Sequence, residues 1–182
     1  MTGCRHHAHD ILPRRARLKS GHEVEIRPVE ERDGALIRDG FAHLSDQSRF
    51  MRFLATRGAL SDAELARLTD AGDDDSLALG AVTQPDTTPV GLARFIRLDP
   101  AGPDAEMALT VVDAFQGQGA GRVLLETLAQ AARGCGVTAF IALVHRDNHA
   151  MLGLLHSYGA VVEQGMAVDL ELRLPLSSVP AI

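Results

Sequence analysis

A glycine-rich loop in the second half of the chain constrains the fold most strongly. The segment FQGQGAGRVLL, residues 115–125, places three glycines within five residues and continues directly into a leucine-rich stretch. It follows AEMALTVVD, residues 105–113, whose apolar pattern predicts a β-strand. The first turn of a helix leaves backbone N–H groups without partners and carries a partial positive charge. A loop between a strand and a helix therefore predicts an anion site, most naturally for phosphate, although an ordinary turn is the alternative.

Two nucleotide-binding loops can be tested by their spacing. The phosphate loop of NTPases requires G-x-x-x-x-G-K-[ST], but Arg122 and Val123 follow Gly121 in this sequence. The dinucleotide fingerprint requires G-x-G-x-x-G and an acidic residue near the end of the next strand. Here the spacing is G-x-G-x-G, and the next predicted strand ends in Val144 and His145. Neither motif fits.

The apolar pattern of the remaining chain predicts an α/β fold. Alternating apolar residues predict strands, and apolar residues at helical spacing behind Ser or Asp caps predict helices. Strands at 76–84 and 90–99 flank a turn around QPDTTP and are expected to form an antiparallel hairpin within a sheet of mixed direction. Further strands are expected at 23–29, 138–145 and, as one strand or two, 161–176; helices are expected at 31–44, 45–54, 61–70, 119–136 and 149–159.

Three segments divide the chain. Residues 1–22 mix Gly, Pro and charged residues without apolar periodicity, so they are expected to form a disordered leader. Residues 23–176 are expected to form one folded domain without an internal repeat or linker. Residues 177–182 follow as a C-terminal tail.

Composition argues against several classes of partner. The formal net charge of −6 argues against a general affinity for nucleic acid or anionic membranes. Cys4 and Cys135 suit neither a disulfide framework nor a zinc site, and no apolar run has the length of a signal peptide core or a membrane span. A soluble, cytoplasmic protein is therefore expected. No metal is expected either: His6, His7 and His9 could hold one, but a solvated tail explains them more simply.

The loop does match the motif Q-x-x-G-x-G, filled by Gln116, Gly119 and Gly121. Through this motif the sequence resembles the GNAT superfamily of acetyl-CoA-dependent N-acyltransferases over about residues 24–174. A second motif places Asn148 before an apolar helix closed by a glycine. The resemblance implies a mostly antiparallel mixed sheet of about six to seven strands, flanked by about four to five helices, in which the fourth strand diverges from the fifth.

A further segment resembles one group within the superfamily. Residues 44–54, LSDQSRFMRFL, match the Leu-Ser-x-x-Ser-Arg-x-x-Arg-Phe signature of bacterial Pat-type protein lysine acetyltransferases. The resemblance implies a protein lysine as acceptor; a small amine, or a catalytically weak acyl-CoA sensor, is the alternative. Arg49 and Arg52 would line the acceptor entrance, or they form a solvated helix face paired with Asp46. A monomer or a homodimer is expected, with acetyl-CoA and an amine as its partners.

The resemblance also assigns the cofactor contacts. Main-chain groups of Val111 and Val112 would pair with the pantetheine arm of CoA like an added strand, and Asn148 would bond near that arm. The alternatives are that both valines are core residues and that Asn148 only caps its helix. The backbone of the loop would hold the pyrophosphate, through Gln116, Gly117, Gln118, Gly119, Ala120, Gly121 and Arg122.

The implied reaction is attack of an amine on the thioester carbon. A lysine side chain, with an ordinary pKa of about 10.4, must first lose a proton, so a general base is required. Glu106 lies on the strand before the loop, on the face it shares with Ala108 and Thr110, and is the candidate base; the alternative is an exposed strand-end carboxylate. The position where many members carry a tyrosine acid holds Leu155, so no acid is assigned.

Overall fold

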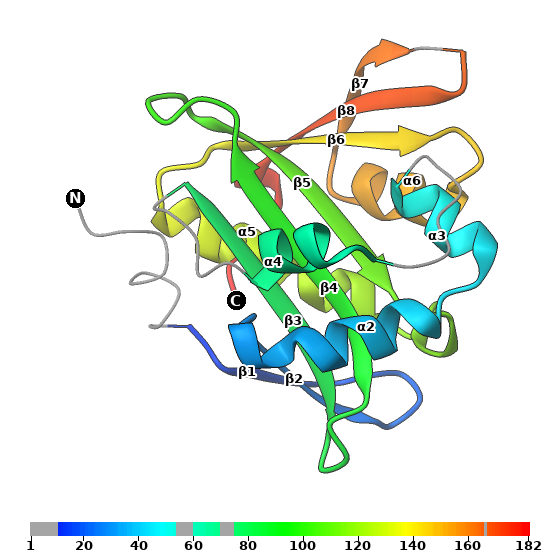
Figure 1. Ribbon diagram of the computed structural model, residues 1–182. Helices are drawn as coiled ribbons and strands as arrows, with labels where there is room; N and C mark the ends of the chain where they lie inside the picture. The colour runs from blue at the N-terminus through cyan, green and yellow to red at the C-terminus, as the bar shows by residue number, and fades with distance from the viewer. Residues whose placement is uncertain (1–10, 54–59, 70–74, 166) are drawn as a thin grey trace.

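A mixed sheet with the strand order β1-β2-β3-β4-β5-β6-β8-β7 forms the centre of the fold (Figure 1). The structure is a computed structural model that describes residues 11–53, 60–69, 75–165 and 167–182. Neighbouring strands pair antiparallel except β5 and β6, which are parallel. The strands are β1 Arg14–Arg17, β2 Glu23–Pro28, β3 Ser76–Gln84, β4 Pro89–Arg97, β5 Asp104–Val111, β6 Ala139–His145, β7 Val161–Gly165 and β8 Asp169–Pro175.

Helices cover both faces of this sheet. In Figure 1, α2 and α4 lie in front of the sheet, whereas α5 crosses behind it against β4 and β5. The α-helices are α2 Gly34–Ala42, α3 Asp46–Phe53, α4 Asp62–Thr69, α5 Ala120–Gly134 and α6 His149–Ser157, with single 3-10 turns at Glu31–Asp33, Asp113–Phe115 and Leu176–Ser178. The α/β class, the mixed sheet and the β3–β4 hairpin confirm the sequence prediction, with more strands than expected.

The additional strand, β1, lies in the segment predicted to be a disordered leader, so that prediction is wrong for residues 11–22. Strand β1 pairs antiparallel with β2, and the following Leu18 is only 4% exposed. Arg14 donates a hydrogen bond to Thr127 of α5 at 2.9 Å. The sequence RRAR of β1 has no apolar stripe. Its stabilisation comes instead from pairing with β2 and from contact with α5. Residues 1–10 lie outside the described part of the chain.

The C-terminal segment also packs on the domain. Val179 is buried, and Arg133 of α5 donates hydrogen bonds to the carbonyls of Leu176 and Val179 at 2.7 and 2.9 Å. The first part of the predicted tail therefore belongs to the folded domain.

Strands β5 and β6 diverge, as predicted for the fourth and fifth predicted strands. Their parallel pairing runs only from Asp104 opposite Ala139 to Glu106 opposite Ile141. Beyond Glu106, β5 continues to Val111 and β6 to His145 without pairing with each other, although each still pairs with its other neighbour. The edge of β5 that faces β6, and the edge of β6 that faces β5, are therefore open beyond Glu106.

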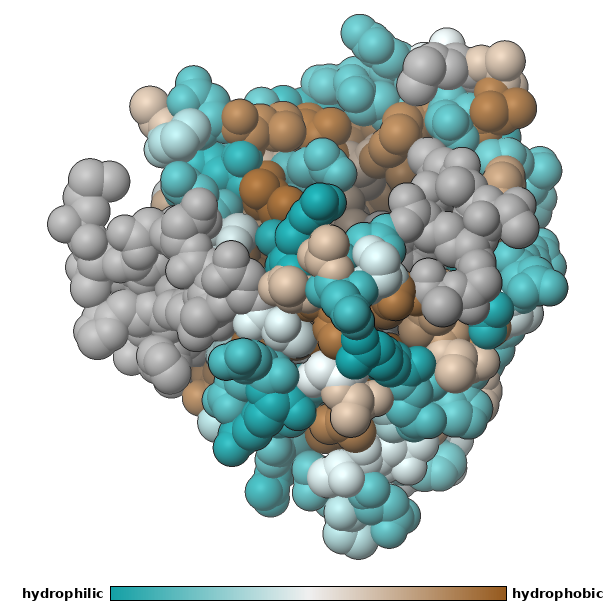
Figure 2. All heavy atoms as spheres, viewed as in Figure 1, coloured by the Kyte–Doolittle hydropathy of each residue, from teal (hydrophilic) through white to brown (hydrophobic). Residues whose placement is uncertain are grey.

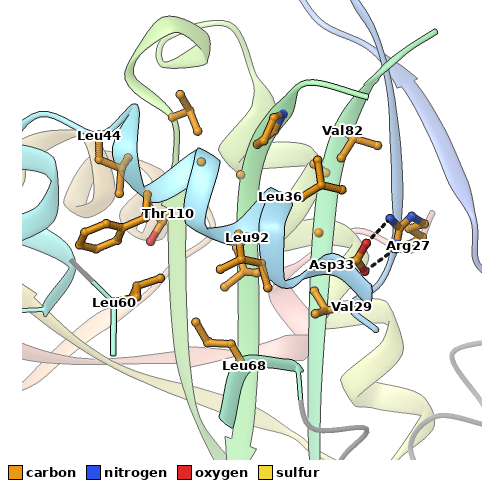
Figure 3. A pocket seen from close by; sticks show the side chains of 18 residues that line it. Arg27, Val29, Asp33, Leu36, Leu44, Leu60, Leu68, Val82, Leu92 and Thr110 are labelled. Atoms are coloured by element: carbon orange, nitrogen blue, oxygen red, sulfur yellow. Dashed lines mark hydrogen bonds and ion pairs between the residues drawn. The ribbon is translucent and has the colours of Figure 1, made fainter. Parts of the chain in front are cut away.

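An apolar cavity of about 90 Å³ lies between α2 and the sheet (Figure 3). Figure 3 shows Arg27 and Asp33 facing each other at one end of it, where two hydrogen bonds of 2.7 and 2.6 Å join them. The hydrogen-bonded Arg27 guanidinium lowers the pKa of Asp33. This charged pair lines the cavity, whose walls also include Gly40, Gly80 and Gly91.

Replacing Gly80 by alanine is expected to stabilise the protein by about 0.4–1 kcal/mol, because the unfolded chain loses freedom and the methyl group fills part of this cavity. An added Cβ would meet Val29 Cγ2 at 3.5 Å, an ordinary contact. The matched control is Gly91→Ala, because an added Cβ there would lie 2.6 Å from the Thr110 carbonyl oxygen. This variant is expected to lower the free energy of unfolding by about 1–3 kcal/mol. Thermal unfolding measures both, and a loss of stability in Gly80→Ala would contradict this packing.

Candidate active site

A cleft of about 860 Å³ lies where β5 and β6 diverge. Its walls come from β5, β6, the glycine-rich loop and the starts of α3, α5 and α6. The predicted site residues that line it are Glu106, Val111, Gln116, Gly117, Gly119, Gly121, Arg122 and Asn148. The divergence of two neighbouring strands therefore brings together residues that are more than 40 positions apart in sequence.

The glycine-rich loop enters α5 through left-handed backbone. Gly117 has a φ of 71° and Gly119, the N-cap residue, a φ of 97°. Glycine adopts these angles without the steric penalty that a Cβ brings. A Cβ added at either position would meet no protein atom within 4 Å, so the outer surface of the loop is open. The first backbone N–H groups of α5 lie beside this open surface, which suits an anion.

Both glutamines of the loop use their side chains within the protein. The Gln116 amide donates to the Val111 carbonyl at 3.1 Å and to Ser48 Oγ at 3.2 Å. The Gln118 amide donates to the Ala114 carbonyl at 2.6 Å. The side chains of Gln116 and Gln118 are thus engaged within the protein. A contact between the cofactor and the backbone groups of these two residues stays a prediction.

Helix α3 is tied to the same loop through Asp113. The Ser45 N–H donates to the Asp113 carboxylate at 3.3 Å, and Gln116 donates to it at 3.2 Å. Burial acts to raise the pKa of Asp113, but hydrogen bonds from Ser45 and Ser48 outweigh it and lower the pKa. The two serines of the Leu-Ser-x-x-Ser signature therefore hold α3 against the loop, a contact that sequence reasoning missed.

The open backbone edge of β5 is formed by odd-numbered residues. The Val112 N–H donates to the Val90 carbonyl at 2.9 Å, so Val112 faces β4, and the direction alternates along the strand. Leu109 and Val111 consequently point their main-chain groups toward the cleft. Val112 lines the apolar cavity instead. The cofactor contact predicted for Val111 stays a prediction, whereas the Val112 N–H is already bonded to β4, so Leu109 rather than Val112 lies on the open edge.

Glu106 is the last residue of β5 that pairs with β6. It is exposed, and it lies between Ile96 of β4 and Ile141 of β6 in the sheet register. Its neighbours Ala105 and Met107 are buried on the opposite face of the strand. The carboxylate thus stands at the point where the cleft opens.

The Acetyltransferase (GNAT) family matches residues 43–160. The chain belongs to the GNAT acetyltransferase family. Acetyltransferase PA5475 of Pseudomonas aeruginosa is 32% identical over 146 residues, which cover 79% of this chain and 78% of that protein. Acetyltransferase Pat of Mycolicibacterium smegmatis is 32% identical over 83% of this chain, but the match spans only 45% of its length.

Solved GNAT structures share the fold. The GNAT domain of S. lividans PAT superposes with a TM-score of 0.81 at 26% identity, covering 89% of this chain and 96% of that domain. The structure of yncA from Salmonella typhimurium, solved with its cofactor acetyl-CoA, gives a TM-score of 0.67 at 26% identity, covering 84% of this chain and 94% of that one.

Asn148 caps α6 in this GNAT domain. Its side-chain oxygen accepts a hydrogen bond from the Met151 N–H at 3.1 Å. The capping alternative is thus the contact that the structure describes, while Asn148 also lines the cleft. A contact between Asn148 and a cofactor stays a prediction.

Arg49 contacts α2 rather than the cleft. Its guanidinium lies 5.0 Å from the Phe41 ring centre and donates hydrogen bonds to the carbonyls of Phe41 and Ala42 at 3.3 and 3.1 Å. It also lies 3.5 Å from Asp46. These contacts favour a structural role over the predicted acceptor contact. The side chain of Arg52 lies outside the described part of the chain.

The single tyrosine does not line the cleft. Tyr158 is 6% exposed, and its hydroxyl donates to the Glu126 carboxylate of α5 at 2.6 Å. Burial, together with this hydrogen bond, raises the pKa of Tyr158 to about 12. Leu155, in the position of the usual tyrosine, is fully buried. Neither residue lines the cleft, so neither provides a proton donor there.

Tyr158→Phe is expected to lower the free energy of unfolding by about 1–3 kcal/mol, because a hydrogen bond to a carboxylate is lost, while kcat stays unchanged. The phenylalanine ring keeps the contact with Arg122, whose guanidinium lies 5.4 Å from the Tyr158 ring centre. Thermal unfolding and thiol release measure the two quantities. A large loss of kcat at unchanged stability would instead make Tyr158 the general acid.

The described residues contain neither a metal centre nor a membrane-spanning helix. Among them, no group of three or more His, Cys, Asp or Glu side chains is arranged to hold a metal ion. None of the helices in this part of the chain is long and apolar enough to cross a membrane.

Proposed function

We propose that this GNAT acetyltransferase transfers the acetyl group of acetyl-CoA to the side-chain amine of a protein lysine. One observation carries the proposal. A single cleft joins an anion site, at the start of α5, to an exposed carboxylate, Glu106, along the open edge of β5. This arrangement suits a ligand with a phosphate at one end and a reactive carbonyl at the other.

The chain offers matching groups for each part of acetyl-CoA. The backbone N–H groups from Gly119 to Arg122 would hold the pyrophosphate, with the exposed Arg122 guanidinium adding charge. The main-chain groups of Leu109 and the N–H of Val111, whose carbonyl already accepts from Gln116, would bond the pantetheine arm as an added strand does. The ligand would then run along β5 toward Glu106, with its thioester at the carboxylate end of the cleft.

The reaction follows from this placement. Glu106 accepts a proton from the lysine ammonium, directly or through water. The neutral amine attacks the thioester carbon, so that a C–N bond forms and the C–S bond breaks. Coenzyme A leaves as a thiolate, which is a good leaving group and needs no protein acid. This agrees with the positions of Leu155 and Tyr158 outside the cleft.

The lysine acceptor rests on the resemblance of residues 44–54 to the signature of Pat-type protein lysine acetyltransferases. Two relatives of this chain carry the names Pat and PAT. In this chain, the Leu-Ser-x-x-Ser segment fastens α3 beside the cleft. A cytoplasmic reaction agrees with two cysteines that suit no disulfide framework.

One experiment separates the possible acceptors. Purified protein is incubated with acetyl-CoA and either a cell-protein extract or a panel of small amines, while free thiol and acetyl-lysine are measured. The proposal expects thiol release with the extract and acetylated lysines in its proteins. Thiol release with small amines alone would assign a small-molecule acceptor. Tight CoA binding without thiol release from any acceptor would overturn the enzymatic function.

A further inference from the structure

One row of side chains crosses the sheet beside the candidate base. The register places Ile96 opposite Glu106, Glu106 opposite Ile141, Ile141 opposite Arg173 and Arg173 opposite Val161. Residues that pair across neighbouring strands project from the same face of a sheet. Glu106 therefore lies within a continuous surface that runs from β4 through β6 and β8 to β7.

The same face continues one step toward the end of β6. Leu143 follows Ile141 by two residues, so it projects from the same face, and it pairs with Glu171 of β8. We call the surface formed by Ile96, Glu106, Ile141, Leu143 and Glu171 the acceptor face. It adjoins the cleft, because Glu106 and Leu143 line both.

Large apolar side chains are exposed on and next to the acceptor face. Ile96 is 43% exposed and Leu143 45%, and the neighbouring Val161 of β7 is 56% exposed. Figure 2 shows hydrophobic surface in this region, and Figure 1 shows no described helix in front of the middle of β6 or β8. Single exposed apolar residues are common, but several on one open sheet face indicate a contact surface.

Around the row, the sheet face carries the carboxylates of Asp104, Glu106 and Glu171 and the cations Arg94 and Arg173. The cation of the row, Arg173, bonds Asp104 at 2.6 Å and lies 3.8 Å from Glu163, so two carboxylates already neutralise it. Within the described ranges, Glu106 and Glu171 form no ion pair. Two carboxylates separated by apolar side chains therefore remain for a cationic partner.

The register also fixes the spacing of these two carboxylates. Glu106 and Glu171 are two strands apart and two residues apart along the strand direction. Strands lie about 4.8 Å apart and residues rise about 3.3 Å, so the two Cα atoms are about 12 Å apart. An extended peptide covers this distance in about three to four residues, at about 3.3–3.6 Å each.

We infer that the acceptor is a protein segment with a second basic residue about three to four positions from the acetylated lysine. The lysine lies at Glu106, the second cation at Glu171, and an apolar side chain between them packs on Ile141 and Leu143. A small polyamine would satisfy the carboxylates but leave the apolar side chains of this face in water. The inference rests on the proposed lysine acetyltransferase function and adds a sequence preference to it.

Synthetic peptides test this preference. Each peptide contains one lysine, an apolar residue beside it and one arginine, placed either three, four or eight residues from the lysine; a fourth peptide carries glutamine in place of the arginine. Thiol release gives kcat and KM for each, and spermidine serves as the small amine. With the wild-type protein, the KM of the peptides with near arginine is expected to be about threefold to fivefold lower than that of the others, because exposed ion pairs are weak.

Two variants locate the effect. Glu171→Gln is expected to remove the difference between the arginine and glutamine peptides without changing kcat; its control is Glu23→Gln, which removes an exposed carboxylate of β2. Leu143→Ser is expected to raise the KM of every peptide, and its control is Val162→Ser, next to Val161 but on the opposite face of β7. Acetyl-CoA affinity confirms that each variant is folded.

The outcomes separate this inference from the proposed function. Acetylation of peptides with equal KM at every arginine position, unaffected by Glu171→Gln, would overturn the acceptor preference and leave lysine acetylation standing. Acetylation of spermidine with no acetylation of peptides or extract would overturn both.

Discussion

Glu106→Gln is expected to lower kcat for acetyl transfer by about 10²- to 10⁴-fold, the range that general-base catalysis contributes. The substitution keeps the shape of the side chain but removes its ability to take a proton from the acceptor ammonium. Glu106 is exposed and lies between Ile96 and Ile141, so the amide is accommodated without repacking. The affinity for CoA should stay unchanged, because the predicted phosphate contacts lie at the other end of the cleft.

Two further variants make this result specific. Glu106→Asp keeps a carboxylate with a shorter reach and is expected to retain part of the activity. Glu23→Gln, on β2, removes the same charge far from the cleft and is expected to leave turnover unchanged. Single-turnover thiol release measures the chemical step, and calorimetry measures CoA binding. Wild-type turnover in Glu106→Gln would remove Glu106 as the base.

Gly119→Val is expected to weaken CoA binding by about tenfold to a hundredfold. Gly119 has a φ of 97°, and a side chain in left-handed backbone costs about 1–2 kcal/mol. A Cβ there would meet no protein atom within 4 Å, so the side chain would project into the space where phosphate oxygens must approach the backbone. The substitution thus acts on the ligand as well as on the backbone.

Gly136→Val is the matched control for the backbone effect. Gly136 follows α5 with a φ of 80°, and its added Cβ is equally free of contacts, but it lies at the opposite end of that helix from the loop. Both variants should lose similar stability in thermal unfolding, while only Gly119→Val should lose CoA affinity. Equal CoA affinity in the two variants would contradict an anion site at the start of α5.

Local signals in the sequence best predicted the elements that line the cleft. The glycines of the loop, the apolar stripe of α5 and the cap at Asn148 each act over a few residues, so their structural effect can be inferred without the rest of the chain. The position of Glu106 on its strand face was predictable for the same reason, since side chains alternate along a strand. These features were enough to indicate the cofactor loop and the candidate base.

Other features depend on which elements pack together. Strand β1 could not be predicted, because its sequence RRAR forms a strand only when β2 offers a free edge and α5 offers Thr127. Arg49 looked available for a substrate, yet it packs on Phe41 once α3 turns back against α2. In both cases the contact that decides the structure comes from another element: Thr127 of α5 for β1, and Phe41 of α2 for Arg49.

The sequence by itself determined the family, the loop before α5 and the face that Glu106 occupies, because these depend on short-range backbone chemistry and on motif spacing. Only the tertiary structure decided that Leu109 rather than Val112 offers its backbone to the cleft, since this depends on which residues bond to β4. Only the register of three strands, β5, β6 and β8, placed Glu106 and Glu171 on one surface with the apolar side chains of β6 between them. Hydrogen bonding between strands, which no local pattern encodes, sets both.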